Sequence, residues 1–184
     1  MKRFLRATGF AHRLIRERLQ TGDVAVDATA GNGHDTAFLA TCVGDSGKVF
    51  AFDIQEEAIR ATGERCANFP QVELIHAGHE QMDLHVSEPV KAVMFNLGYL
   101  PNGDKSKITE VETTIIAIRT SLRLLARGGL LTCILYRGHI GGEAEAEAVE
   151  SELCGLDQDV YTTIRYEFLN QRNSPPALMA VEKR

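Results

Sequence analysis

The sequence predicts an α/β fold, in which one doubly wound, seven-stranded and mostly parallel sheet carries helices on both faces. Apolar runs of four to eight residues alternate with helical stretches along nearly the whole chain. The runs are apolar throughout, as expected for parallel strands that are buried on both faces. Two further runs near the C-terminus are joined by an Asn/Ser/Pro-rich loop and indicate a hairpin that adds one antiparallel strand.

The expected elements follow one another in a regular order. The expected strands are residues 24–27, 48–53, 72–75, 91–96, 129–136, 161–168 and 177–181. A short helical stretch after Gly78 adds to five longer helices, at residues 10–19, 34–42, 56–68, 109–126 and 143–154. The first of these helices has one apolar face, made of Phe10, Leu14, Ile15 and Leu19. We expect one domain over residues 1–184, with residues 1–20 as a basic helix packed on it.

Composition limits the class of protein. Apolar residues make up 44% of the chain and charged residues 24%, as in an ordinary globular domain. No cluster of His, Cys and Asp has the spacing of metal ligands. Without a signal peptide or a run of membrane-spanning length, we expect a cytoplasmic protein, and the sequence leaves a homodimer open. No CxxC pair occurs, and we expect reduced, mostly buried thiols at Cys42, Cys66, Cys133 and Cys154.

The charges are distributed unevenly, although their formal sum is only −5. The first twenty residues contain six Lys or Arg and a single acid, Glu17, whereas residues 143–159 contain seven acids and no Lys or Arg. The net negative charge argues against a protein that coats nucleic acid indiscriminately. The basic segment could still contact a polyanion while the acidic segment repels it. The alternative is a pair of solvated helix faces of opposite sign.

The strongest motif joins the first expected strand to the next helix. Residues 27–36 read Asp-Ala-Thr-Ala-Gly-Asn-Gly-His-Asp-Thr. Ligands of open α/β sheets bind beyond the carboxyl ends of the strands, where the strand order reverses. Gly31 and Gly33 would let the backbone approach such a ligand closely, with the carboxylate of Asp27 beside it. Asp53 ends the second strand twenty residues after Gly33, where an acid can accept hydrogen bonds from both ribose hydroxyls of an adenosine.

The choice of nucleoside depends on charge. Thr36 stands where a dinucleotide fingerprint has its third glycine, and an acid at the strand end suits a pyrophosphate poorly. S-adenosylmethionine carries an ammonium and a sulfonium, which Asp27 and Asp35 would attract. His79 and Glu80, after the third strand, could flank the adenine. The expected cofactor-binding residues are therefore Asp27, Thr29, Gly31, Asn32, Gly33, Asp35, Thr36, Asp53, Ile54, His79 and Glu80.

These features resemble the class I methyltransferases, which have a Rossmann-like fold and use S-adenosylmethionine. Thr29 replaces the first glycine of their common Asp-x-Gly-x-Gly pattern, as in some RNA methylases. Four segments are similar to one small bacterial family known as putative rRNA methylases: residues 27–36, 96–101, 136–142 and 170–176. Characterised members methylate the aminomethyl group of 5-aminomethyl-2-thiouridine at the tRNA wobble position. The resemblance implies this N-methyltransferase activity, with the tRNA anticodon stem-loop as the partner.

The expected catalytic group begins in Asn96-Leu-Gly-Tyr-Leu-Pro101, which is similar to the Asn-Pro-Pro-Tyr motif of amino-group methyltransferases. The carbonyl of Asn96 would orient the amine, and the ring of Tyr99 would hold a base. Tyr136 and His139 could accept or relay the proton that the amine must lose. The alternatives are a loop whose Asn and Pro only form turns and a plain loop histidine.

Other polar and loop residues are expected to contact the substrate. Asn170 and Asn173 could bond a base edge and Arg172 a phosphate, although an ordinary connecting loop is the alternative. His12, on the first helix, could line the site, but a surface or packing histidine is the favoured interpretation. The complete expected substrate-binding set is Gly98, Leu100, Pro101, Arg137, Asn170, Arg172 and Asn173.

Four other functions stay open at this point. An rRNA methyltransferase and a small-molecule methyltransferase share the same chemistry but differ in substrate. A binding domain without catalysis is disfavoured by the intact segment at residues 96–101. An NAD-linked oxidoreductase is disfavoured by Thr36.

Overall fold

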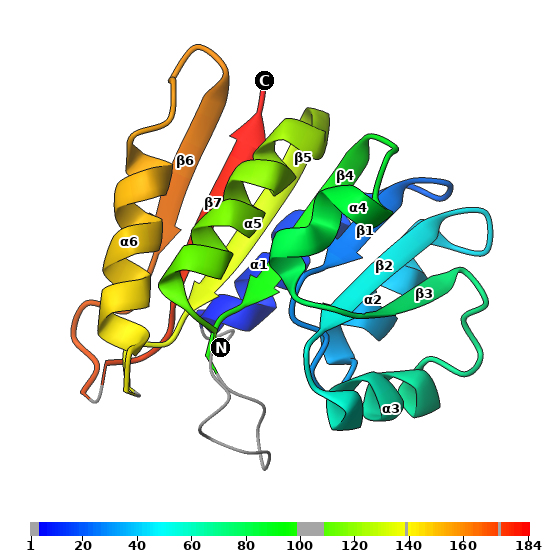
Figure 1. Ribbon diagram of the computed structural model, residues 1–184. Helices are drawn as coiled ribbons and strands as arrows, with labels where there is room; N and C mark the ends of the chain where they lie inside the picture. Colours follow the sequence, from blue (N-terminus) through cyan, green and yellow to red (C-terminus); the bar gives the residue numbers. More distant parts are fainter. Residues whose placement is uncertain (1–3, 99–108, 139, 173) are drawn as a thin grey trace.

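Seven strands form one sheet in the computed structural model, which describes residues 4–98, 109–138, 140–172 and 174–184. The strands are β1 (Val24–Asp27), β2 (Lys48–Asp53), β3 (Val72–His76), β4 (Val90–Asn96), β5 (Leu125–Leu135), β6 (Tyr161–Tyr166) and β7 (Ala177–Lys183). Their order in the sheet is β3-β2-β1-β4-β5-β7-β6 (Figure 1). Only β7 is antiparallel, to both β5 and β6. The predicted sheet, mostly parallel with one antiparallel strand, is confirmed.

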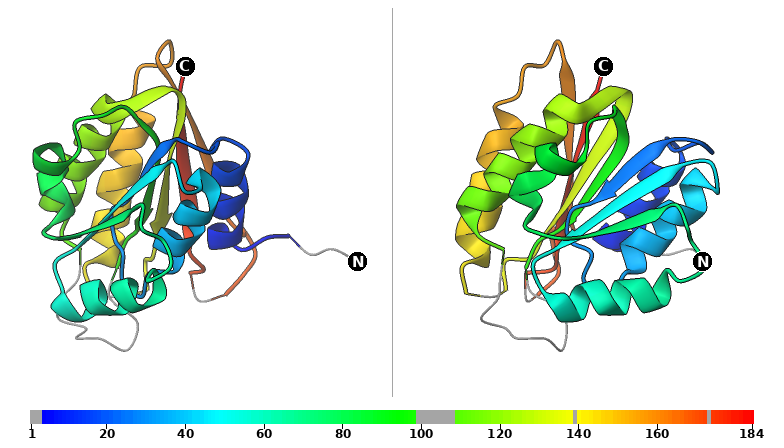
Figure 2. Two further views of the ribbon diagram at one scale, coloured as in Figure 1. Left: turned by 90° about the vertical axis from the view of Figure 1, so that its right-hand side faces the viewer. Right: turned by 45° about the vertical axis from the view of Figure 1, so that its right-hand side comes forward.

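Helices cover both faces of this sheet. They are α1 (Ala7–Arg16), α2 (His34–Val43), α3 (Glu56–Arg65), the 3-10 turn η1 (His79–Gln81), α4 (Met82–His85), α5 (Val111–Leu124) and α6 (Gly142–Cys154). The views in Figure 2 show α1 and α2 on one face and α4, α5 and α6 on the other. Among the described helices, none is long and apolar enough to cross a membrane.

The central strands are mostly apolar because alternate side chains enter two separate cores. In β4, Val93 and Phe95 join the cluster covered by α5 and α6. Ala92 and Met94, from the same strand, join the cluster covered by α1 and α2. Both faces of the central strands are therefore buried, as the apolar runs predicted.

The first and third helices differ most from the expectation. The first helix spans Ala7–Arg16 instead of residues 10–19, because its buried face includes the small residues Ala7 and Ala11 as well as Ile15. The third helix stops at Arg65 instead of residue 68. Pro70 follows closely. A proline disfavours the helical conformation for the residue before it, so the helix ends earlier and a turn follows.

The junction of α5 and β5 also differs from the expectation. Strand β5 begins at Leu125, where a helix to residue 126 was expected. Leu125 already pairs with Val90, and regular pairing resumes only at Leu130 opposite Ala92. The residues between them form a bulge, in which Gly128 has a φ of +68°.

A separate correction concerns the cysteines: all four are unpaired, but Cys154, expected to be buried, is exposed.

The sheet order places two loops side by side. β1 and β4 are neighbours, and the chain builds the sheet outward from them in both directions. The strand order therefore reverses between them, and their carboxyl ends lie at one edge. Asp27 and Asn96, which end these strands, belong to this edge.

Candidate active site

A pocket of about 1000 Å³ lies beyond the carboxyl ends of the central strands. Its walls come from the loops after β1, β2, β3, β4 and β5, from the loop between β6 and β7, from the starts of α2 and α5, and from α1. Four carboxylates belong to the lining, those of Asp35, Asp53, Glu80 and Glu110, and none of the described lining residues is a Lys or Arg. Such a lining favours a cationic ligand over a pyrophosphate.

The glycine loop after β1 is fixed to the ends of β2 and α3. The carboxylate of Asp53 accepts hydrogen bonds from the backbone N–H groups of Gly31 and Gln55, both at 2.9 Å. The hydroxyl of Thr62 donates to the carbonyl of Gly31 at 3.1 Å. Gly33 has a φ of +75°, and a Cβ there would lie 2.9 Å from the Cα of Thr62. Both the conformation and the close approach require a glycine at this position.

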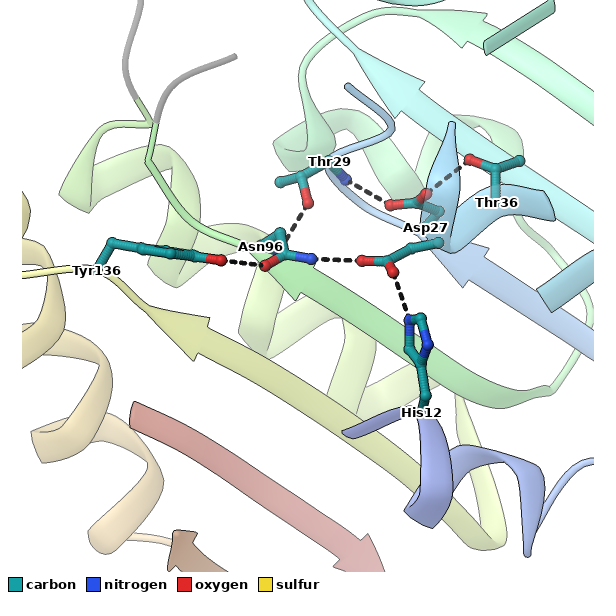
Figure 3. Close-up of polar contacts among 7 residues, drawn as sticks. His12, Asp27, Thr29, Thr36, Asn96 and Tyr136 are labelled. Atoms are coloured by element: carbon teal, nitrogen blue, oxygen red, sulfur yellow. Dashed lines mark hydrogen bonds and ion pairs between the residues drawn. The ribbon is translucent and has the colours of Figure 1, made fainter. Parts of the chain in front are cut away.

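The side chain of Asp27 also fixes this loop. Its side chain is fully buried and accepts hydrogen bonds from the backbone N–H of Thr29 at 3.1 Å and from the hydroxyl of Thr36 at 2.6 Å (Figure 3). Burial, followed by the nearby charge of Asp35, raises the pKa of Asp27 to about 7. This carboxyl group is not part of the pocket lining. Its contacts give it a role in shaping the loop.

A chain of hydrogen bonds joins five segments on the other side of the pocket: α1, the loop after β1, α2, β4 and the residue after β5 (Figure 3). The backbone N–H of Asn96 donates to the hydroxyl of Thr29 at 2.7 Å, across the point where the strand order reverses. The Asn96 amide donates from Nδ2 to Oδ2 of Asp35, and its Oδ1 accepts from the hydroxyl of Tyr136 at 3.3 Å. Nε2 of His12 lies 2.6 Å from Oδ1 of Asp35. Burial, and then the charge of Asp35, raises the pKa of Tyr136, so this hydroxyl is a donor at neutral pH.

A second cluster fixes the two ends of the segment that follows β4. The backbone N–H of Gly98 donates to the hydroxyl of Thr109, and the N–H of Thr109 donates to the carbonyl of Gly98, both at 3.0 Å. The carboxylate of Glu145, on α6, is 3% exposed and accepts from the hydroxyls of Thr109 and Thr114, each at 2.7 Å. Residues 98 and 109 are thereby held together at the pocket wall.

Most of the residues predicted to bind the cofactor belong to the pocket lining. His79 is nearly buried there, and its ring donates from Nδ1 to the carbonyl of Ala28 at 3.1 Å. Burial lowers the pKa of His79, so the ring is neutral. The predicted residues in the lining are Thr29, Gly31, Asn32, Asp35, Asp53, Ile54, His79 and Glu80, whereas those behind it are Asp27, Gly33 and Thr36.

The residues predicted for catalysis and substrate binding are more scattered. Arg137 turns to α6, where it forms ion pairs with Glu143 and Glu150. Asn170 and Arg172 are exposed on the loop between β6 and β7, outside the pocket lining. Asn96, Gly98 and Tyr136 belong to the lining. The predictions for Tyr99, Leu100, Pro101, His139 and Asn173 fall outside the residues that the structure describes.

His12 packs on Phe38, as the favoured interpretation predicted, but it also lines the pocket, which was the alternative. It belongs to the pocket lining together with Thr8, four residues earlier on α1. Ala7 and Ala11 are buried on the same helix, and such small residues let a helix approach its neighbours closely. Two polar side chains at i and i+4 beside a stripe of alanines were the available signal. Thr109, Glu110 and Thr113, at the start of α5, also line the pocket without having been predicted.

Known proteins resemble the chain over most of its length. The family model described as "Putative rRNA methylase" matches residues 49–182. The "tRNA (mnm(5)s(2)U34)-methyltransferase, chloroplastic" of Arabidopsis thaliana is 38% identical over 192 aligned residues, with 97% of this chain and 70% of the relative covered.

Solved structures show that the similarity includes the three-dimensional fold. A "putative rRNA-methylase" from Clostridium thermocellum has a TM-score of 0.98 and 46% identity, with all of both chains covered. A "putative methyltransferase" from Streptococcus mutans, solved in complex with SAH (S-adenosylhomocysteine), has a TM-score of 0.92 and 39% identity, covering 99% of this chain and 100% of the other. The resemblance inferred from the motifs is thus confirmed, and the chain belongs to the putative rRNA methylase family of class I, S-adenosylmethionine-dependent methyltransferases.

Proposed function

We propose that this methyltransferase converts the 5-aminomethyl group of (2-thio)uridine at the tRNA wobble position to 5-methylaminomethyl. The observation that carries the proposal is the placement of Asn96, whose amide is held between Asp35 and Tyr136 at the wall of an acid-lined pocket. The name of the Arabidopsis thaliana relative supports the choice of substrate.

The residues of the pocket fit S-adenosylmethionine as the cofactor. This cofactor supplies an electrophilic methyl group on a positively charged sulfur. Asp53 ends β2 with its carboxylate in the pocket lining, where it can accept hydrogen bonds from ribose hydroxyls. Ile54, which is 57% exposed, and the neutral ring of His79 offer apolar surface to an adenine. The carboxylate of Asp35 adds the negative charge that an ammonium and a sulfonium require.

The amine needs a geometry that Asn96 can supply. An alkylammonium has no free lone pair, so the amine must lose a proton before it can attack. Oδ1 of Asn96 can accept an N–H of the neutral amine and thereby fix the direction of its lone pair. Alignment of this kind can contribute roughly 7–11 kcal/mol to a two-reactant step. Tyr136, with its raised pKa, donates to Asn96 and is therefore a poor candidate for the base.

Helix α1 is the proposed RNA-binding element. It contributes Thr8 and His12 to the pocket lining, and its N-terminal flank carries the exposed Arg6. Arg13 pairs with Glu17 on the surface, and such an exposed pair exchanges readily for a phosphate contact. The cytoplasm, as the compartment that holds tRNA in bacteria, is the proposed location.

The test uses purified protein, labelled S-adenosylmethionine and bulk tRNA from cells that lack this gene. We expect 5-methylaminomethyl-2-thiouridine in the digested tRNA, detected by mass spectrometry. Asn96→Ala should lower the rate about 100-fold, since it removes the acceptor that aligns the amine. Asn68→Ala, at an exposed asparagine outside the pocket, is the matched control and should keep the wild-type rate.

Two other results would redirect the proposal. Methylation of rRNA but not tRNA would replace the substrate and leave the chemistry intact. Methylation of free amines that is insensitive to the double charge reversal Arg6→Glu and Arg13→Glu would indicate a small-molecule enzyme. For the tRNA enzyme, this double variant should have a higher KM for tRNA. Its affinity for tRNA should also fall less steeply with added salt than that of the wild type.

A further inference from the structure

His12 makes two contacts with α2 that fix its ring. Asp35 and Phe38 lie one turn apart on α2, and His12 reaches both of them from α1. Its ring stacks on Phe38, with ring centroids 4.0 Å apart and planes 6° from parallel. Its Nε2 lies 2.6 Å from Oδ1 of Asp35. A carboxylate only accepts hydrogen bonds, so Nε2 must be the donor, and the length is that of a charge-assisted bond.

Asp35 transmits this contact to Asn96. One carboxylate oxygen of Asp35 faces His12, and the other accepts Nδ2 of Asn96. A flipped Asn96 amide would turn its own oxygen toward that carboxylate and lose the hydrogen bond. Asp35 therefore selects the orientation in which Oδ1 of Asn96 is directed to Tyr136 and the pocket. At 3.3 Å the bond from Tyr136 is long, which leaves Oδ1 able to accept a further N–H.

The orientation of this amide matters for an amine substrate. Oδ1 accepts an N–H of the amine and leaves the nitrogen lone pair free to attack. A flipped amide would present its NH2 group instead, and the lone pair of the amine would accept that hydrogen bond. The amine would then be bound but unreactive, so amide orientation acts on kcat more than on substrate binding.

We propose that His12 is a positioning residue for methyl transfer, which holds Asp35 in the place where it keeps Oδ1 of Asn96 turned to the amine. The inference rests on the proposed role of Asn96 in amine methylation. Asp35 is only 12% exposed, so the carboxylate has little water to replace a lost donor. Without His12, the charge of Asp35 can turn to other donors, and the Asn96 amide loses its fixed partner.

A pair of substitutions separates donation from packing. His12→Phe keeps a ring that can stack on Phe38 but has no donor, whereas His12→Gln keeps a donor near the position of Nε2 but loses the ring. We expect His12→Phe to lower kcat about tenfold with KM for tRNA nearly unchanged. His12→Gln should recover most of the lost kcat. His85→Phe, at an exposed histidine outside the pocket lining, is the matched control.

The opposite pattern would overturn the proposal. If His12→Phe keeps its kcat, or if His12→Gln loses as much as His12→Phe, the ring acts by packing alone. Thermal unfolding identifies a variant that fails to fold, and His12→Leu then replaces His12→Phe as the variant without a donor.

A second measurement needs neither substrate nor cofactor. The side-chain NH2 signals of Asn96 can be assigned in the NMR spectrum of 15N-labelled protein by their loss in Asn96→Ala. We expect two well-separated, slowly exchanging signals in the wild type and in His12→Gln, and signals close to those of a free amide in His12→Phe. Unchanged signals in His12→Phe would overturn the proposal. The expected NMR pattern in a protein that does not methylate tRNA would instead count against the proposed function alone.

Discussion

The two sides of the pocket are built in different ways. On the side of β1 and β2, Asp27 and Asp53 accept hydrogen bonds from backbone N–H groups of the loops that follow the strands. On the side of β4 and β5, the contacts run from side chain to side chain, through His12, Asn96 and Tyr136. The first side is held through backbone groups of the loops after β1 and β2, and the second side through side chains that α1, α2, β4 and the end of β5 bring together.

This difference predicts separate effects of substitutions. A loop that is held through its backbone presents the same N–H groups with most side chains. It should lose its shape only where the accepting carboxylate or the obligatory glycine is replaced. A side-chain network depends on every member for its geometry. Changes on the first side should therefore act on cofactor affinity and stability, and changes on the second side on kcat.

The largest effect is expected at Asp53, on the backbone-held side. Asp53→Ala removes the acceptor for the ribose hydroxyls and frees the N–H groups of Gly31 and Gln55. Hydrogen bonds to a charged group contribute about 1.5–3 kcal/mol each, so we expect the Kd for S-adenosylmethionine to rise roughly a hundredfold. Isothermal titration calorimetry measures this value. An unchanged Kd would show that the loop, and not the carboxylate, makes the site.

The obligatory glycine gives the next largest effect. Gly33→Ala places a Cβ 2.9 Å from the backbone of Thr62 at a φ of +75°, and we expect a loss of about 2–3 kcal/mol in the free energy of unfolding. Urea denaturation measures the loss. Gly138→Ala is the control, since a Cβ there meets no atom within 4 Å. Equal stability of both variants would contradict the close packing of the loop on α3.

The buried carboxyl group of Asp27 should make stability depend on pH. Its pKa is about 7 in the folded protein, against a usual value of 3.8, because burial and the charge of Asp35 disfavour ionisation. The folded state then binds the proton more tightly, so this contribution to stability is complete below pH 4 and is lost as the pH rises through 7.

Asp27→Asn tests this linkage, because it is neutral at every pH. We expect the free energy of unfolding to fall less between pH 5 and pH 8 in Asp27→Asn than in the wild type. Asp45→Asn, at an exposed acid, should behave like the wild type. Parallel pH profiles of all three proteins would show that Asp27 is ionised in the folded state.

The same contrast explains what the sequence could predict. The cofactor side follows from a continuous segment, residues 27–36, and from one acid at a fixed offset, Asp53. His12 contacts Asp35 only through the docking of α1, and the i, i+4 pair of Thr8 and His12 on that helix does not specify which element it will face. The guanidinium of Arg137 is suited to a phosphate, but in the folded protein it forms ion pairs with Glu143 and Glu150 of α6. Strand pairing likewise decides that β5 begins at residue 125, opposite Val90.

The smallest effect is expected at Tyr136, the outer end of the side-chain network. Tyr136→Phe removes a hydroxyl whose 3.3 Å bond to Asn96 is long, while Asp35 continues to hold the other end of the amide. We expect kcat to fall about threefold, less than in His12→Phe, with the Kd for S-adenosylmethionine unchanged. Single-turnover kinetics with tRNA measures the rate of the chemical step. If the loss instead matches that of Asn96→Ala, then Tyr136 contacts the reacting amine itself, and the amide alone does not define the substrate side of the pocket.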